Sequence, residues 1–177
     1  NKFLVSKITV KPINYETLQK YDVLVIPRTN GDYSTVEIDA IETFVKEGGG
    51  LLLAPVCWSA SFINPLAARF GIKFATEGQI CHPQNYYPKQ KNAPEISKIE
   101  RTDMLKDINK FYLVNCTYII DTGQSEVIAY SDDDAWFEIP VEKPNSLGHF
   151  PVLSRMTYGK GKVIFITSPV QFFNDWE

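Results

Sequence analysis

The residues best suited to chemistry are a cysteine and its neighbours at the end of a short apolar run. Residues 48–59 read GGGLLLAPVCWS, so Cys57 follows a strand-like segment and is flanked by Trp58 and Ser59. A cysteine thiolate at such a position can attack a carbonyl carbon when a histidine accepts its proton. This segment raises two hypotheses, a nucleophile at the end of a buried strand or a half-buried residue that lines a loop.

A histidine partner for Cys57 is hard to find in the sequence. The chain has two histidines, and neither is followed two residues later by an acid that could orient its ring. His82 lies in a stretch rich in Pro and Asn, whereas His149 directly precedes a strand-like segment. If the chain is an enzyme, the hypothesis is a divergent hydrolase or amidotransferase that uses Cys57 and His149.

Other polar clusters indicate structure more than chemistry. Ser131–Asp134 could attract Ca²⁺, but it lacks the spaced ligands of a calcium loop and is typical of a solvated turn. Gly159-Lys160-Gly161 lacks the full phosphate-loop spacing and predicts a hairpin turn. The three cysteines form no C-x-x-C pattern, so the sequence predicts no metal site, no disulfide framework and no cofactor. The sequence also leaves two hypotheses for four tyrosines. They form either an aromatic platform for a sugar or a peptide, or part of the core of the β-rich half: Tyr86, Tyr87, Tyr112 and Tyr118.

Composition is that of a single globular domain of 177 residues. The net charge of −3 gives no general attraction to nucleic acid, and the apolar runs are shorter than the roughly 20 residues of a membrane helix, so neither nucleic-acid binding nor membrane contact is expected. The chain begins at Asn1 without Met, and we expect a domain excised from a larger protein, lacking its first strand. Compartment and oligomeric state are not indicated.

Hydrophobic patterns predict an α/β order in the first half. Residues 3–10 alternate as a strand does, residues 15–20 form a helical turn, and residues 23–26 and 51–53 are continuous apolar runs typical of strands buried on both faces. Ser34 and Glu37 form a capping box that predicts a helix ending near Gly48. Asn64-Pro65 predicts the start of the next helix, which Gly71 ends.

The second half predicts mainly strands. Residues 78–94 read as a surface excursion, and the expected strands cover residues 111–114, 118–120, 127–130, 136–139, 152–157 and 163–166. Together the patterns favour an α/β fold, a flavodoxin-like three-layer sandwich with a mostly parallel central sheet and a β-rich C-terminal half.

Ligands of open parallel sheets bind beyond the carboxyl ends of the strands, which brings three predicted loops together. The loops cover residues 28–33, 55–63 and 167–175 and also hold Asp32 and Ser61. The predicted ligand-binding residues are Arg28, Asn30, Cys57, Trp58, Ser59, Trp136, Phe173 and Asn174.

The chain resembles the class I glutamine amidotransferase-like superfamily from about Leu18 to Asn174. More narrowly, it is similar to a non-catalytic branch found in gliding-motility and ABC-transport-associated proteins and in an intraflagellar transport subunit. The segments that carry this resemblance are YDVLVIP at 21–27, FVKEGGG at 44–50, LLL at 51–53, NPL at 64–66, FGIKF at 70–74, YGKGKVIFI at 158–166 and FFN at 172–174.

The resemblance implies a binding role more than catalysis. Catalytic members hold their cysteine on a tight elbow between small residues, whereas Val56 and Trp58 flank Cys57. The branch often has a Trp followed by an acid near Trp136, which implies that Trp136 lines the site. We therefore predict a non-enzymatic domain that binds a protein or a small carbohydrate-like ligand within a larger, possibly transport-associated or carbohydrate-related, protein. The remaining alternative is a scaffolding module.

Overall fold

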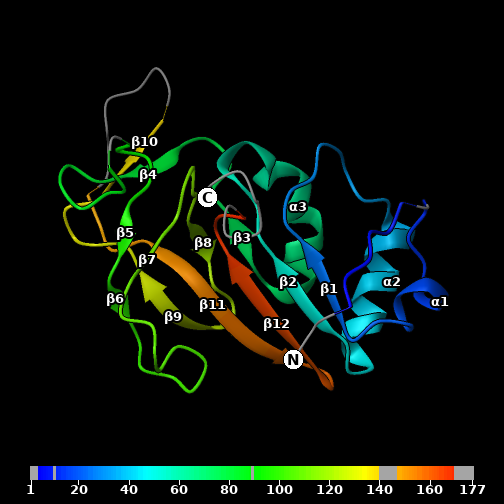
Figure 1. Ribbon diagram of the computed structural model, residues 1–177. Coiled ribbons are helices and arrows are strands. Elements are labelled where there is room, and N and C mark those ends of the chain that lie inside the picture. Colours follow the sequence, from blue (N-terminus) through cyan, green and yellow to red (C-terminus); the bar gives the residue numbers. More distant parts are fainter. Residues whose placement is uncertain (1–3, 10, 89, 140–146, 170–177) are drawn as a thin grey trace.

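The computed structural model describes residues 4–9, 11–88, 90–139 and 147–169 (Figure 1). The helices are α1 (Tyr15–Leu18), α2 (Thr35–Lys46) and α3 (Ala60–Ala67), with 3-10 turns at Cys57–Ser59 and Ala68–Phe70 on either side of α3. The strands are β1 (Val23–Ile26), β2 (Gly50–Leu53), β3 (Lys73–Phe74), β4 (Gln79–Cys81), β5 (Glu95–Ile96), β6 (Lys98–Ile99), β7 (Phe111–Tyr112), β8 (Ile119–Asp121), β9 (Glu126–Tyr130), β10 (Trp136–Glu138), β11 (Pro151–Tyr158) and β12 (Gly161–Ile166).

A six-stranded sheet with the order β1-β2-β12-β11-β9-β6 forms the centre of the molecule. β1 and β12 run parallel to β2, which lies between them. The β12–β11, β11–β9 and β9–β6 pairings are antiparallel. The fold is therefore α/β with a mixed sheet, in which the parallel part comes from the first half of the chain and the last strand.

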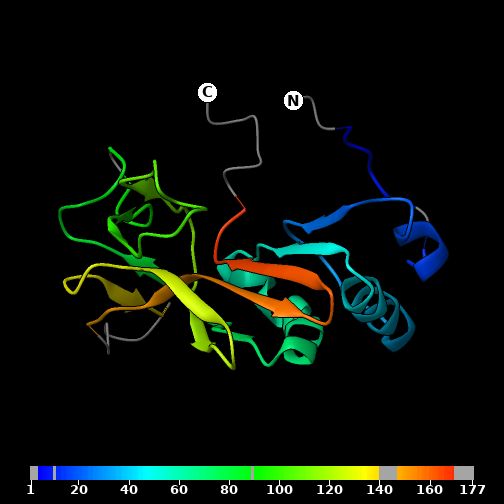
Figure 2. The same cartoon turned by 90° about the horizontal axis from the view of Figure 1, so that it is seen from below.

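The helices α2 and α3 cover one face of the parallel part (Figure 2). Alternate residues of β2 and β12, Leu51, Leu53, Val163 and Phe165, point into this core and are almost fully buried. The helices complete the core with Ile38, Ile41, Phe44 and Val45 from α2 and Ile63, Leu66 and Ala67 from α3. Burial of these apolar faces, at about 25 cal/mol per Å², is the main term that holds the layers together.

The start of α2 confirms the predicted capping box. The Ser34 hydroxyl accepts a hydrogen bond from the Glu37 N–H at 3.3 Å, and the Glu37 carboxylate accepts one from the Ser34 N–H at 3.0 Å. Glu37 also accepts from the Ile13 N–H at 3.1 Å, which ties the chain before α1 to α2. Burial alone would raise the pKa of Glu37, but these hydrogen bonds outweigh it and lower the pKa.

The second half packs around its own apolar cluster. Its fully buried members include Ile80, Ile96, Leu113, Ile128 and Val152, drawn from β4, β5, β9, β11 and the loop after β7. Ile164 and Ile166, which alternate with the first core's residues on β12, pack partly against this second cluster. The β-rich part therefore continues the sheet and covers one end of it.

Two strand predictions in the first half are wrong. Residues 4–9 form no strand, and the rest of the predicted strand, Phe3 and Val10, lies outside the described residues. β1 exists as predicted, but it is the edge of the sheet, with Val23 57% and Val25 44% exposed, and is not buried on both faces. An apolar run fixes strand propensity and leaves open which neighbours cover the strand.

The predicted start of a helix at Asn64-Pro65 is also wrong. α3 begins at Ala60, directly after the 3-10 turn at Cys57–Ser59, and Pro65 lies inside it. The Asn64 side chain does not cap a helix, because it accepts from the Phe74 N–H and donates to the Phe74 carbonyl. A helical segment thus does follow Cys57.

Within the described residues, no helix is long and apolar enough to cross a membrane.

Candidate functional site

The loops after β1 and β2 bring Arg28, Asn30 and Trp58 together at the carboxyl edge of the parallel strands. The Arg28 guanidinium lies 6.0 Å from the centre of the Trp58 ring, within the range of a cation–π contact. The Arg28 Nε donates a long hydrogen bond, 3.4 Å, to the Asn30 Oδ1. Trp58 is 51% exposed, so one aromatic surface of this cluster stays open to a partner.

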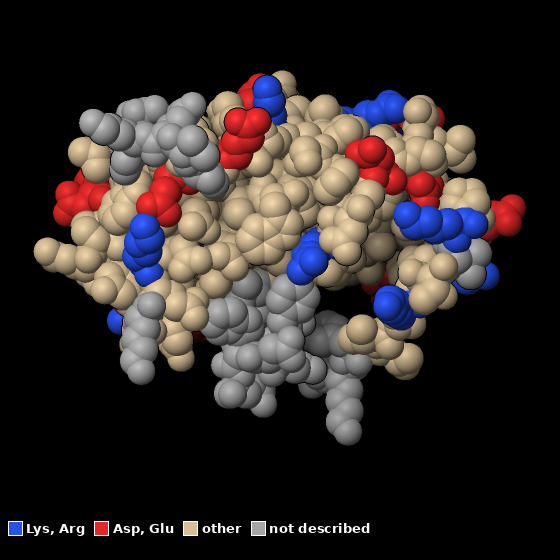
Figure 3. Space-filling view, turned by 90° about the horizontal axis from the view of Figure 1, so that it is seen from above, with Lys and Arg blue, Asp and Glu red and all other residues tan. Residues whose placement is uncertain are grey.

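The view onto the carboxyl ends of these strands shows a broad face with charged side chains mainly towards its margins (Figure 3). Arg28 forms no ion pair with any residue in the described part of the chain. The Arg28 guanidinium, which has no carboxylate partner among the described residues, lies near an exposed indole, and Arg and Trp are both enriched among the residues that dominate binding at protein interfaces.

Cys57 starts the 3-10 turn and contributes little to this open surface. Its N–H donates to the Asn115 carbonyl at 3.2 Å, and burial raises the pKa of its thiol. Ser59 is buried, and its hydroxyl accepts from the Val56 N–H at 3.2 Å, so its side chain closes the turn. A ligand-binding role for Ser59 stays a prediction.

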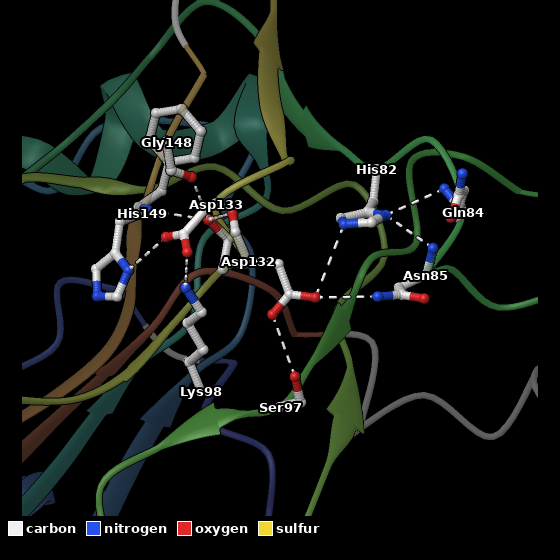
Figure 4. A network of polar contacts seen from close by, with 11 residues as sticks. His82, Gln84, Asn85, Ser97, Lys98, Asp132, Asp133, Gly148 and His149 are labelled. Carbon is white, nitrogen blue, oxygen red and sulfur yellow. Dashed lines mark hydrogen bonds and ion pairs between the residues drawn. The ribbon is translucent and has the colours of Figure 1, made fainter.

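Within the described residues, His149 forms no hydrogen bond or ion pair with Cys57, and its partner is Asp133 (Figure 4 shows the His149–Asp133 pair). Its Nδ1 lies 3.2 Å from Asp133 Oδ1, its ring packs on Tyr130 with centroids 4.3 Å apart, and Asp133 also binds Lys98 at 2.5 Å. Asp133 does orient the His149 ring. It lies in a turn that precedes His149 in the chain, whereas the sequence analysis looked for an acid two residues after the histidine. No nucleophile that the structure describes completes this pair.

His82 has a structural role in the same region (Figure 4). Its Nδ1 accepts from the N–H groups of Gln84 and Asn85, at 3.1 and 2.7 Å, and its Nε2 lies 3.7 Å from Asp132 Oδ2. With both backbone donors on Nδ1, the neutral ring carries its proton on Nε2 and has no lone pair free for a substrate proton. His82 therefore cannot act as a general base in this conformation.

The acidic run 131–134 forms the predicted turn. The Asp132 carboxylate accepts from Asn85 and Ser97, whereas Asp133 pairs with Lys98 and His149. Side-chain hydrogen bonds from Lys98 and His149 lower the pKa of Asp133. The two carboxylates thus serve separate partners, and no group of three metal-ligating side chains gathers within the described residues.

Trp136 lies on a separate ribbon made of β4 and β10. It pairs with Cys81, and the next residue on the same face, Glu138, binds Lys91 at 2.6 Å and lies 3.6 Å from the Cys81 sulfur. Burial and the nearby Glu138 charge raise the pKa of Cys81 to about 12. Trp136 makes no described contact with Arg28 or Trp58, and the predicted residues Phe173 and Asn174 lie outside the described residues.

The sequence analysis missed that the three cysteines converge. The Cys57 N–H bonds to residue 115 and the Ile80 N–H bonds to the Cys116 carbonyl, so the segments that carry the thiols lie side by side. Burial raises the pKa of Cys116, and the neighbouring Cys81 and Cys57 add to this effect. All three are free thiols.

A hollow of about 370 Å³ lies elsewhere, at the far end of α3, and is lined by Asn64, Ala68, Gly71, Ile72, Lys73 and Asp121.

Slow alkylation of Cys57 is the expected result of its raised thiol pKa. Because only the thiolate reacts, we expect iodoacetamide to modify Cys57 at pH 7 more slowly than it modifies free cysteine. The rate should still be rising with pH beyond about 8.5, the ordinary thiol pKa. Mass spectrometry of timed samples measures the rate, and Cys57→Ser identifies the labelled site. Fast labelling with an inflection below the ordinary pKa would restore the catalytic hypothesis.

Comparisons with known proteins show similarity in fold. No protein-family model and no curated protein sequence matches the chain. Among solved structures, the mmIFT52 N-terminal domain is 14% identical with a TM-score of 0.73, and the match covers 92% of this chain and 72% of that one. The cytoplasmic protein STM1381 from Salmonella typhimurium LT2 is 20% identical, with a TM-score of 0.56 and coverage of 89% and 64%. A ThuA-like protein from Bacteroides uniformis ATCC 8492 is 17% identical, with a TM-score of 0.57 and coverage of 88% and 63%.

At these identities the structural neighbours show similarity in fold and no particular activity. The chain spans less than two thirds of the length of the second and third of them.

Proposed function

We propose that this chain is a non-enzymatic protein-binding domain with an amidotransferase-like fold of the flavodoxin type. Its partner contacts the exposed carboxyl edge through Trp58 and Arg28. The observation that carries the proposal is the half-exposed Trp58 ring under an Arg28 guanidinium that has no ion-pair partner among the described residues. Trp and Arg are enriched among the residues that dominate the binding energy of protein interfaces.

The arrangement around Cys57 supports binding over catalysis. Its thiol pKa is raised rather than lowered, and both histidines are engaged with other groups. An acyl-transfer site needs a thiolate and a base within hydrogen-bonding reach, and neither condition is supported here. The similarity in fold to the mmIFT52 N-terminal domain agrees with a domain that is part of a larger protein.

A protein suits this surface better than a small carbohydrate. Small ligands are held in concave sites that bury most of their surface. Trp58 projects from a turn with half its surface exposed, and the described hollow lies at the other end of α3. A partner surface of ordinary size can cover an exposed Trp–Arg pair without a preformed cavity.

Photo-crosslinking tests this proposal in the full-length protein inside its source cells. We expect benzoylphenylalanine in place of Trp58 to yield a discrete protein adduct, and the additional change Arg28→Ala to reduce its yield about fivefold or more, a loss of about 1 kcal/mol. Benzoylphenylalanine in place of Ile120, which is also 51% exposed but lies on β8, is the matched control and should give no such adduct.

The same adduct at both positions, or none at position 58, would contradict the proposal.

A carbohydrate site at Trp58 would be detected by fluorescence quenching. Short β-linked oligosaccharides would quench the fluorescence of wild-type protein and leave that of Trp58→Phe unchanged. That result would replace a protein partner with a sugar.

A further inference from the structure

The loop between β1 and α2 holds the single Asn-Gly pair of the sequence, Asn30-Gly31. Both residues lie in a bend outside the helices and strands, and the Asn30 side chain is exposed. A Cβ atom added at Gly31 would meet no atom within 4 Å, so this glycine is not required by close packing. Because Gly31 has no side chain, nothing on that residue hinders the approach of its backbone nitrogen to the Asn30 side chain.

An asparagine followed by glycine can modify itself. The backbone nitrogen of the glycine attacks Cγ of the asparagine, which closes a five-membered imide ring and releases ammonia. The step is favoured because the nucleophile and the carbonyl carbon belong to the same short segment of chain. Water then opens the ring at either carbonyl and leaves aspartate or isoaspartate, so that an amide and water become a carboxylic acid and ammonia.

Arg28 lies where it assists this attack. Its Nε donates a long hydrogen bond, 3.4 Å, to the Asn30 Oδ1. The attack on Cγ turns this oxygen into an oxyanion, and a cationic donor that already contacts the oxygen stabilises the developing charge. Arg28 forms no ion pair among the described residues, so no carboxylate there neutralises its charge.

Thr29 lies where it assists the nucleophile. The Gly31 N–H donates to the Thr29 Oγ1 at 3.3 Å, and the same hydroxyl donates to the Gly31 carbonyl at 2.7 Å. The Gly31 nitrogen must lose its proton as the ring closes, and an acceptor already bound to the N–H favours that loss. The N–H lies in the peptide plane, whereas the attacking electron pair stands perpendicular to it, so the hydrogen bond does not block the attack.

We propose that Asn30 is a self-modifying site, at which Arg28 and Thr29 promote conversion of the asparagine to aspartate and isoaspartate without an enzyme. The Gly31 N–Asn30 Cγ bond forms, the Asn30 Cγ–Nδ2 bond breaks, and the proton of the Gly31 amide leaves with the ammonia. Water is the co-reactant of the second step, and no oxidant or reductant is involved.

The product changes the charge of the carboxyl edge. A carboxylate at position 30 takes the place of the oxygen that accepts from Arg28, and it pairs with that guanidinium. The ion pair neutralises the cation that lies 6.0 Å from the centre of the Trp58 ring. If the carboxyl edge binds a protein as proposed above, on which this step rests, the conversion weakens that binding.

Peptide mapping by mass spectrometry tests the conversion in the purified full-length protein, sampled over time at mildly alkaline pH. We expect aspartate and isoaspartate to accumulate at Asn30 and not at Asn85, which is also exposed but precedes Tyr86. Gly31→Ala should abolish the conversion, because the added methyl group hinders the nitrogen while the fold has room for it.

Two further variants test the assistance from the loop. Arg28→Met and Thr29→Val should each slow the conversion at Asn30 about threefold or more, less than the loss of a donor from a buried oxyanion hole because this loop is exposed. In guanidinium chloride the loop geometry is lost, so both variants should convert at the wild-type rate. Far-ultraviolet circular dichroism without denaturant checks that each variant is folded.

The proposal would be overturned by a conversion at Asn30 no faster than at Asn85. An unchanged rate in Arg28→Met or in Thr29→Val would also overturn it, as would an equal slowing of either variant in guanidinium chloride, which would reveal an effect of local sequence alone.

The photo-adduct at position 58 tests the consequence separately. We expect Asn30→Asp to lower its yield about fivefold or more, a loss of about 1 kcal/mol, and Asn85→Asp to leave it unchanged. An unchanged yield in Asn30→Asp would show that the new charge does not weaken binding. The absence of any adduct at position 58 would contradict the proposed function and leave the conversion at Asn30 standing, because peptide mapping needs no partner.

Discussion

Phe165→Ala is expected to lower the free energy of unfolding by about 3–5 kcal/mol. Phe165 is fully buried in β12, where the parallel part of the sheet meets the helical layer. Its ring lies 6.2 Å from that of Phe70 and 6.4 Å from that of Phe74, centre to centre, so one side chain links the 3-10 turn after α3, β3 and the sheet. Alanine would remove these contacts and leave a cavity that the rigid neighbours cannot fill. Urea denaturation followed by circular dichroism measures the loss.

Val36→Ala provides the control for this core substitution. Val36 is in the first turn of α2 and is 65% exposed, so its truncation removes little buried surface. Alanine also favours helix more than valine does, and we expect a change of less than about 0.5 kcal/mol. A loss below about 1 kcal/mol for Phe165→Ala would mean that the two layers are not held together at this ring.

Local chemistry made several elements of the fold predictable. The capping box at Ser34 and Glu37, the apolar stripe of α2 and the left-handed Gly71, with φ of 74°, each depend on residues a few positions apart. Their signals survive in the sequence because the partners are neighbours along the chain. The same holds for the hairpin between β11 and β12, whose strands are joined directly through Gly159 and Lys160.

Errors arose where distant partners decide the structure. The sequence around Asn64 is typical of a helix cap. In the structure, however, the Asn64 side-chain amide forms two hydrogen bonds with the backbone of Phe74, ten residues further along the chain. β1 looks like a fully buried strand because apolar side chains do not reveal whether another layer covers them. The His149–Asp133 pair joins residues 16 apart, which no local spacing rule detects.

The candidate site was predictable in its position and less so in its members. Sheet topology placed the loops after β1 and β2 at one edge, and Arg28, Asn30 and Trp58 do meet there. Ser59 points inward because its hydroxyl is needed to close the turn, a contact that depends on the 3-10 geometry. The convergence of the three cysteines required knowledge of which segments run beside one another, which only the fold supplies.

Gly161→Ala is expected to destabilise the protein by about 1–3 kcal/mol, although alanine adds a single methyl group. Gly161 begins β12, where it packs against the C-terminal end of α2, and a Cβ atom there would overlap the carbonyl oxygens of Val45 and Gly49. These acceptors are backbone atoms and cannot rotate away, so the helix or the strand must shift. Urea denaturation measures the effect.

Gly31→Ala is the matched control, because a Cβ atom at Gly31 would meet nothing within 4 Å, and we expect less than about 0.5 kcal/mol of change. Together the two variants test why the glycines of Gly159-Lys160-Gly161 are there. A phosphate loop uses glycine to bring its backbone to a ligand, so its substitution would cost ligand binding while the ligand-free protein stayed stable. A hairpin packed on a helix uses glycine to bring two backbones together, so the loss must appear in the ligand-free protein, as the position of Gly161 against α2 requires.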